Sequence, residues 1–135
     1  MLMPPISRYM TRQPWTIDHG ATLTCAHELM RSHAIRHLPV TAAGKLVGIV
    51  SERDLHLIET LPDADPDEVT VEDAMTETVY VARPADDVAE VVDRMAAQKL
   101  GSVVVMQDRR VEGIFTSIDA LSVLSSVLRR TVDAR

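Results

Sequence analysis

The chain has 135 residues, of which 46% are apolar and 3% aromatic, and its formal net charge is −6. This length suits a single module and is too short for an enzyme domain joined to a regulatory domain. The acidic balance disfavours nucleic acid as the main partner, because neutralisation of phosphates dominates that affinity.

Cysteine usage and apolar patterning indicate the compartment. Cys25 is the only cysteine, which excludes an internal disulfide and fits a reducing environment. The first residues lack the basic start and apolar core of a signal peptide. No apolar run approaches the ~20 residues that a membrane-spanning helix needs. We therefore expect a soluble cytoplasmic protein without membrane contact.

The chain contains an internal repeat, in which residues 6–60 align without insertion with residues 71–125. Each copy begins with a leading segment, residues 6–11 and 71–76, that is predicted to form one helical turn. Both leading segments end in a Met-Thr pair, Met10-Thr11 and Met75-Thr76. Short extended segments with an aromatic residue follow at residues 14–17 and 79–82.

The next segments of each copy have the pattern of a helix, a hairpin and a second helix. Thr22 and Asp87 are predicted N-caps of helices whose apolar residues recur at spacings of three and four. Strands are predicted at residues 35–40 and 100–105, and turns follow them, with Gly44 suited to a hairpin. Further strands then lead directly into closing helices, over residues 52–60 and 117–130.

The expected fold is α/β of the α+β type, with two β-α-β-β-α repeats packed with pseudo-two-fold symmetry around a shared cleft. Repeat 1 covers residues 1–62, including a leading segment at 1–11, and repeat 2 covers residues 69–135. An acidic, proline-containing linker at residues 63–68 joins them. Each copy alone buries too little apolar area to be comfortably stable, so we expect the two to pack together.

A hydroxyl residue and an aspartate recur where a strand meets a helix, as Ser51-x-x-Asp54 and Thr116-x-x-Asp119. A helix N-terminus can hold an anion such as a phosphate, and the carboxylate can accept hydrogen bonds from a ribose diol. The same spacing also forms a capping box, in which hydroxyl and acid only close the helix end. Both interpretations stay open from the sequence.

The ordered set of motifs resembles a tandem pair of cystathionine-β-synthase (CBS) domains, often called a Bateman module. The resemblance rests on the two Met-Thr pairs, on the strands at 35–40 and 100–105, and on the segments Gly48–Asp54 and Gly113–Asp119. It covers nearly the whole chain. It implies a binding module without catalytic residues, which takes AMP, ADP, ATP or S-adenosylmethionine as a regulatory ligand and requires no cofactor. Some family members bind NAD-type or cyclic dinucleotides.

The resemblance also assigns roles to individual positions. Asp54 and Asp119 would hold ribose hydroxyls, and Ser51 and Thr116 would contact ribose or phosphate. The residues that would line the adenine pockets are Thr16, Ile17, Arg36, His37, Leu38, Pro39, Val81, Ala82, Ser102 and Val103. Family modules commonly form homodimers and signal to an effector protein, so we expect a homodimer and an effector that the sequence does not identify.

The two copies differ at the helix start. Arg53 supplies a guanidinium suited to phosphate, whereas the second copy has Ile118 at that position. We therefore expect the stronger phosphate site at Ser51, Arg53 and Asp54. A surface ion pair is the alternative role of Arg53. The five histidines all lie in the first half and show no metal-ligand spacing on one element, so we expect no metal site.

The leading hypothesis is a regulatory module that senses an adenosyl ligand between its repeats and transmits a change of conformation to a partner. The alternative is a dimerisation scaffold whose ligand sites are vestigial and whose Ser/Thr-x-x-Asp motifs are only caps. A single-stranded nucleic-acid binder is disfavoured by the negative charge and the scarcity of aromatic residues.

Overall fold

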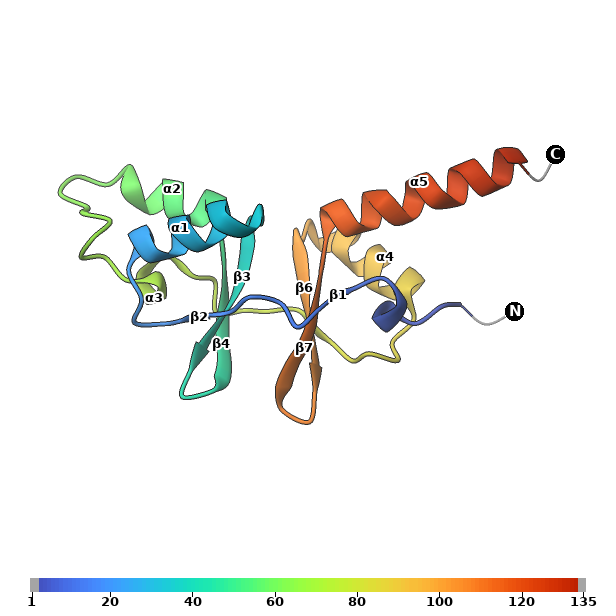
Figure 1. Cartoon of the computed structure of the whole chain (residues 1–135), viewed down its shortest axis with the longest axis horizontal. Helices are drawn as coiled ribbons and strands as arrows, with labels where there is room; N and C mark the ends of the chain where they lie inside the picture. The colour runs from blue at the N-terminus through green and yellow to red at the C-terminus, as the bar shows by residue number, and fades with distance from the viewer. Residues whose placement is uncertain (1–2, 134–135) are drawn as a thin grey trace. The chain divides into compact units, whose positions relative to one another are not determined.

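The computed structural model describes residues 3–133 and divides the chain into two compact units. One unit is Pro14–Val79 and contains the single tryptophan, so we call it the Trp15 unit. The other combines the residues up to Gln13 with those from Tyr80 onward, and we call it the Phe115 unit after its single phenylalanine. Both are mixed α/β units, which confirms the predicted fold class (Figure 1).

The Trp15 unit has a three-stranded sheet in the order β2-β3-β4, with β2 parallel to β3 and β3 antiparallel to β4. Its elements are β2 (Ile17–Asp18), α1 (Leu23–His33), β3 (His37–Ala42), β4 (Lys45–Ser51), α2 (Glu52–Glu59) and α3 (Val71–Ala74). The core is aliphatic and is formed by Ile17, Leu23, Ala26, Met30, Leu38, Val40, Val50, Leu55 and Val71.

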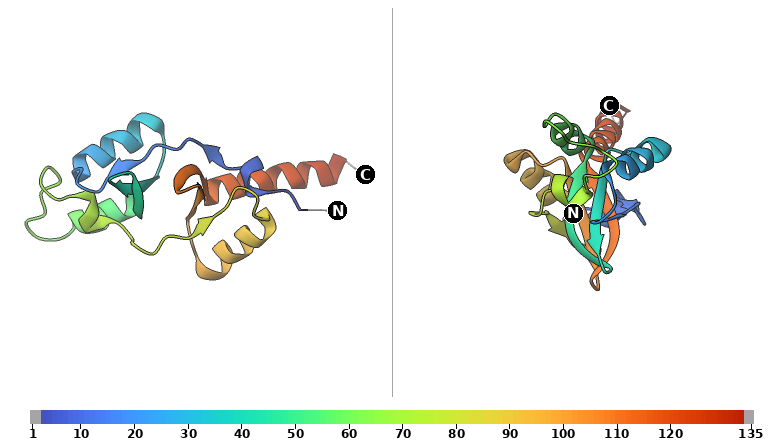
Figure 2. Two further views of the ribbon diagram at one scale, coloured as in Figure 1. Left: turned by 90° about the horizontal axis from the view of Figure 1, so that it is seen from below. Right: turned by 90° about the vertical axis from the view of Figure 1, so that its left-hand side faces the viewer.

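The Phe115 unit has a four-stranded sheet in the order β1-β7-β6-β5. Its elements are the 3-10 helix η1 (Ile6–Arg8), β1 (Thr11–Arg12), β5 (Val81–Ala82), α4 (Val88–Gln98), β6 (Ser102–Gln107), β7 (Arg110–Thr116) and α5 (Ser117–Asp133). Its core is formed by Ile6, Met10, Ala82, Val88, Val91, Met95, Val103, Val105 and Phe115. The views in Figure 2 show α5 as a long helix that continues from β7.

Each leading segment belongs to the unit built by the other repeat. Thr11 and Arg12 form β1, which pairs antiparallel with β7 of repeat 2. In the Trp15 unit, Thr76 of repeat 2 bridges Ile49 of repeat 1, with N–H···O distances of 2.8 and 3.0 Å. The repeats at 1–62 and 69–135 therefore describe the sequence, whereas the packing units exchange their leading segments.

Two glycines allow this exchange, because the leading segment crosses the strand directly above them. A Cβ on Gly113 would lie 2.4 Å from the Met10 sulfur and 3.0 Å from the Thr11 carbonyl oxygen. A Cβ on Gly48 would lie 2.7 Å from the Met75 sulfur and 2.9 Å from the Thr76 carbonyl oxygen. Each repeated Met-Thr pair thus packs directly against one of the repeated glycines.

Local sequence signals explain the other elements. The Thr22 and Asp87 side chains cap α1 and α4, as predicted. The β3–β4 and β6–β7 turns place two consecutive residues at positive φ, Ala43 and Gly44 in one copy and Asp108 and Arg109 in the other. This is the geometry of the tight turns that match strand twist. Within residues 3–133, no helix combines the length and apolarity needed to cross a bilayer.

Candidate functional site

The corner between β4 and α2 forms the capping box that the sequence allows. The Asp54 amide donates to Ser51 Oγ at 3.1 Å, and the Ser51 amide donates to Asp54 Oδ2 at 2.9 Å. A further amide is also used, because Glu52 N donates to the Arg36 carbonyl at 2.9 Å. The capping interpretation is therefore confirmed, and this corner offers an anion fewer open amides than the sequence pattern suggests.

The corner between β7 and α5 repeats this arrangement. The Thr116 amide donates to Asp119 Oδ2 at 2.9 Å, and the Asp119 amide donates to Thr116 Oγ1 at 3.4 Å. The Ser117 amide donates to the Gly101 carbonyl at 3.0 Å, as Glu52 does to Arg36. The two corners are equivalent in their main-chain bonds.

Capping uses only one of the two carboxylate oxygens of Asp54 and of Asp119. Both Asp54 and Asp119 use Oδ2 in the cap, and within residues 3–133 neither Oδ1 atom has a hydrogen-bond partner. Both side chains are half-buried. Each carboxylate can therefore close its helix and still accept a hydrogen bond from a sugar hydroxyl.

The strand beside each corner brings further predicted residues to the same place. His37 pairs with Ser51 across β3 and β4, and Ser102 pairs with Thr116 across β6 and β7. Burial lowers the pKa of His37, Asp54 opposes the shift, and Arg36 adds to it. The imidazole is consequently uncharged at neutral pH, which suits contact with a neutral base.

The remaining predicted residues divide by exposure. Thr16, Arg36, Arg53 and Val81 are exposed and can reach a ligand with their side chains. Four residues lie in the cores and could contact a ligand only through main-chain atoms or a side-chain edge; they are Ile17, Leu38, Ala82 and Val103. Pro39 is also buried, but it does not belong to the core cluster of its unit.

A proline makes the two copies different at the neighbouring edge. In the Phe115 unit the Val104 amide donates to the Tyr80 carbonyl at 3.0 Å. The position of Val104 is taken by Pro39 in the first copy, and proline has no N–H to donate. The Trp15 carbonyl, which corresponds to that of Tyr80, therefore receives no hydrogen bond from residue 39. It can accept a hydrogen bond from another donor beside Thr16.

Two contacts were not anticipated from the sequence. Trp15 is 53% exposed and stacks on His33, with ring centroids 3.8 Å apart and planes 14° apart. In the other unit the Arg94 guanidinium lies 4.1 Å from the Tyr80 ring centroid. The aromatic residue of each extended segment is thus held by a side chain of the following helix. Trp15 and Tyr80 occupy matching positions of the repeat, whereas His33 aligns with Gln98 and Arg94 aligns with Leu29. The repeat therefore indicated the two aromatic residues but not their partners.

Comparison with known proteins identifies the architecture. The family model described as the CBS domain matches residues 6–57 and again residues 71–126. The chain belongs to the CBS domain family. Both repeats are matched, and together they cover well over half of the chain.

Solved structures agree with this assignment. A protein from Vibrio cholerae assigned to acetoin utilization (AcuB) has a TM-score of 0.85 and 30% identity, with 99% of each chain covered. The CBS domain pair of protein MJ0100 was crystallised with 5′-methylthioadenosine and S-adenosyl-L-methionine. It has a TM-score of 0.80 and 28% identity, over 92% of this chain and 98% of that one.

One curated relative is much longer than this chain. The uncharacterized protein MJ1225 of Methanocaldococcus jannaschii is 27% identical over 127 residues, which are 86% of this chain. The chain spans only 45% of the length of MJ1225. The CBS pair is therefore the part that the two proteins share.

Proposed function

We propose that this CBS pair is a non-catalytic regulatory module that binds an adenosyl compound and passes the resulting change of conformation to a partner protein. The observation that carries the proposal is the pair of half-used carboxylates, Asp54 and Asp119, each with Oδ1 open beside a strand-to-helix corner. The adenosyl ligands of the MJ0100 pair, which shares 28% of its residues with this chain, support the ligand class.

The first copy is the stronger candidate for a phosphorylated ligand. Arg53 is exposed one residue before Asp54, and Arg36 is exposed at the start of the paired strand. The second copy places Ile118 at the position of Arg53, and Ile118 is 62% exposed. We propose that AMP, ADP or ATP binds through Ser51, Arg53 and Asp54, and that the Asp119 site takes an adenosyl group without phosphates.

Loss of ligand-induced stabilisation in aspartate variants tests the proposal. A nucleotide present at about 100 times its dissociation constant should raise the free energy of unfolding by about 2.7 kcal/mol. Asp54→Ala should abolish most of this gain for AMP, ADP or ATP, because hydrogen bonds to a charged group contribute about 1.5–3 kcal/mol. Asp119→Ala should do the same for S-adenosylmethionine. Thermal unfolding with each ligand measures both effects.

A variant that removes only a helix cap provides the control. Asp87 caps α4 through the amides of Ala89 and Glu90, at 2.7 and 3.4 Å. Asp87→Ala should cost about 1 kcal/mol of stability and leave ligand stabilisation unchanged. Ligand stabilisation that survives in both Asp54→Ala and Asp119→Ala would show that the ribose assignment is wrong. Absence of stabilisation by every ligand in the unmodified chain would favour the scaffold alternative.

Self-association is the second part of the proposal, and α5 supports it. The helix buries none of its residues and exposes a row of apolar side chains at spacings of three and four, 43–69% exposed. They are Ile118, Leu121, Leu124, Val127, Leu128 and Val132. Such a continuous apolar face is unusual on a monomer and marks an interaction surface. We propose that a second copy of the chain covers it in a homodimer.

A charge on this face should break the dimer. The double variant Leu121→Glu/Leu128→Glu should run as a monomer in size-exclusion chromatography with light scattering, at a concentration where the parent is a dimer. Both side chains are more than half exposed, so the fold should tolerate the change. Ser126→Glu, on the opposite side of α5, should leave the dimer intact. A parent that is monomeric at every concentration would refute the dimer.

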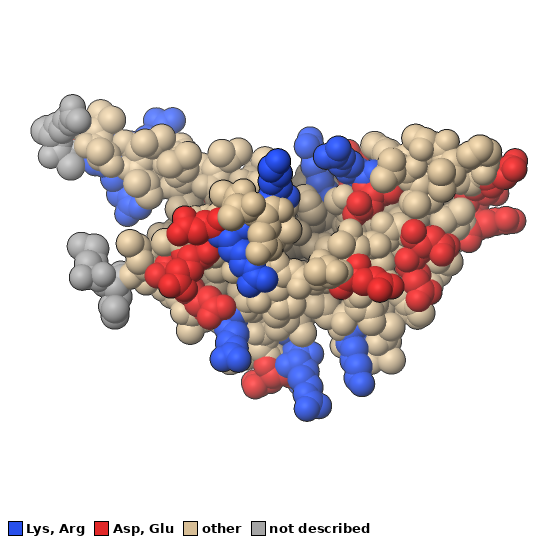
Figure 3. Space-filling model, turned by 180° about the vertical axis from the view of Figure 1, so that it is seen from behind, with Lys and Arg blue, Asp and Glu red and all other residues tan. Residues whose placement is uncertain are grey.

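Charge distribution disfavours the nucleic-acid alternative. On the face shown in Figure 3, both acidic and basic side chains are present, and the formal net charge of the chain is −6. A nucleic-acid surface instead needs clustered lysine and arginine side chains to follow the phosphates.

A further inference from the structure

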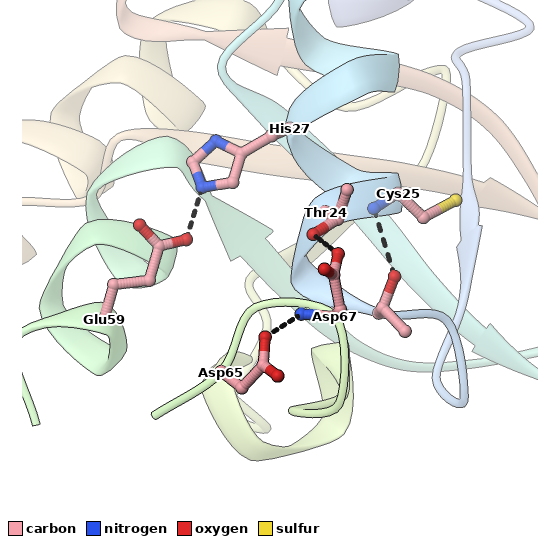
Figure 4. Close-up of polar contacts among 7 residues, drawn as sticks. Thr24, Cys25, His27, Glu59, Asp65 and Asp67 are labelled. Carbon is pink, nitrogen blue, oxygen red and sulfur yellow. Dashed lines mark hydrogen bonds and ion pairs between the residues drawn. The ribbon is translucent and has the colours of Figure 1, made fainter. Parts of the chain in front are cut away.

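Three side chains with metal-binding atoms come together on the two main helices of the Trp15 unit. His27 comes from α1, and His56 and Glu59 come from α2. One ligand atom from each lies within 4.8 Å of the other two. His27 Nε2 is 2.6 Å from Glu59 Oε1, and Figure 4 shows the imidazole directed across at the carboxylate. None of the three is among the candidate nucleotide-binding residues.

Helix geometry explains why these residues converge. His56 and Glu59 are three residues apart on α2 and therefore share a face. His27 follows the buried Ala26 on α1 and so lies at the edge of the face that packs in the core. The His27 and His56 rings are stacked, with centroids 5.5 Å apart and planes 27° apart. The cluster therefore joins α1 to α2 at the rim of the core.

We propose that His27, His56 and Glu59 form a binding site for a divalent first-row transition metal ion, with zinc as the reference ion. Two imidazoles and one carboxylate are a three-ligand set that Zn²⁺ uses when its fourth position is left to water. Imidazole also suits Co²⁺ and Ni²⁺, whereas Mg²⁺ and Ca²⁺ require oxygen ligands. The partial burial of His27 and Glu59, with side chains 22% and 24% exposed, reduces competition from solvent.

The distances require only side-chain adjustment. Zinc–ligand bonds of about 2.0–2.1 Å in a tetrahedral site place the ligand atoms roughly 3.3 Å apart. The 2.6 Å contact between His27 and Glu59 must open slightly, and the wider separations, up to 4.8 Å, must close. His56 is exposed and can rotate toward the others without disturbing the core. The helices themselves need not move.

The competing explanation is a simple hydrogen bond between a histidine and a glutamate. The same unit contains such a pair, in which His19 Nδ1 lies 3.4 Å from Glu72 Oε2. Within residues 3–133 no third ligand atom joins that pair. The pair of His19 and Glu72 therefore serves as an internal control, because a histidine–glutamate pair without a third ligand should not contribute to zinc binding.

Zinc titration of the full, untagged chain tests the site. Cys25 is exposed and is a potential zinc ligand, so all measurements use a Cys25→Ser background. Figure 4 shows Cys25 on the other side of α1 from His27. After removal of metal with a chelator, calorimetric titration with zinc chloride should give one site per chain, and Mg²⁺ should give none. Co²⁺ should produce the visible absorption bands of a tetrahedral site.

Single substitutions decide whether the three residues act together. Loss of a residue that only supports a metal ligand typically weakens metal binding about 10- to 100-fold. Because these residues are proposed as direct ligands, we expect a larger loss of zinc affinity in each of His27→Gln, His56→Ala and Glu59→Gln. His19→Gln should retain the affinity of the parent. Circular dichroism should show each variant folded. His56→Ala is the decisive variant, because the side chain is exposed.

Two results would overturn the proposal. The first is a parent chain that does not bind zinc stoichiometrically. The second is unchanged zinc affinity in His56→Ala, because the His27–Glu59 pair would then be a hydrogen bond and the zinc would lie elsewhere.

Discussion

Replacement of Phe115 by alanine is expected to lower the free energy of unfolding by about 3–5 kcal/mol. Phe115 is fully buried near the C-terminal end of β7 and, among the described residues, is the largest fully buried side chain. Truncation removes a ring from a core that is otherwise aliphatic, and it leaves a cavity that the sheet and α4 can fill only in part. Small domains have only roughly 5–15 kcal/mol of stability, so the loss is a large share of the total.

Urea unfolding followed by far-ultraviolet circular dichroism measures this change. Trp15 fluorescence should be recorded beside it, because it reports on the other unit. Val132→Ala is the control, since this side chain is 69% exposed and its loss should change stability by no more than about 0.5 kcal/mol. A Phe115→Ala midpoint equal to that of the control would contradict the assignment of Phe115 to the core.

Signals that act over a few residues were readable from the sequence. The caps at Thr22 and Asp87, the turn at Gly44 and the capping boxes at Ser51 and Thr116 all depend on residues within one helical turn or hairpin. Each of these predictions is confirmed. The repeat strengthened these predictions, because the same local signals occur at matching positions in both copies.

Features that depend on distant residues were not readable in the same way. The exchange of leading segments brings Thr11 to Ile114 and Thr76 to Ile49. Each repeat reads as a complete unit, so nothing local shows which sheet its leading segment joins. His27 and His56 likewise lie on different helices and meet only because α1 and α2 pack together. The search for metal-ligand spacing on one element could not find them.

The exchange has a consequence for dissection of the chain. A cut in the 63–68 segment would separate each leading segment from the sheet it completes. That segment is itself held in place, because Asp67 accepts from the Thr24 hydroxyl at 2.6 Å (Figure 4). The Thr24 amide also donates to the Pro66 carbonyl at 3.1 Å. The two repeats are therefore poor choices as separate fragments, although the sequence marks them clearly.

Valine at Gly113 or Gly48 is expected to cost about 1–3 kcal/mol by overpacking, and to release the leading segment that crosses the strand. The methionine sulfur above each glycine can move aside, because it ends a flexible side chain. The carbonyl oxygens of Thr11 and Thr76 cannot, since their backbones are paired with β7 and with Ile49. The clash must therefore push the backbone of the leading segment away from the sheet.

Hydrogen exchange distinguishes this local release from general destabilisation. The amides of Gln13 and Thr76, which donate to Glu112 and Ile49 at 3.0 and 2.8 Å, should exchange much faster in the corresponding valine variants. Gly44→Asn is the matched control, because the site is open and asparagine tolerates its φ of 79°. Met10→Ala has a cost of its own, because Met10 belongs to the core, so the double variant Met10→Ala/Gly113→Val is compared with Met10→Ala alone. In that background Gly113→Val should still lower stability, because the Thr11 carbonyl remains. Absence of any further loss would show that the methionine, and not the crossing backbone, sets the need for glycine.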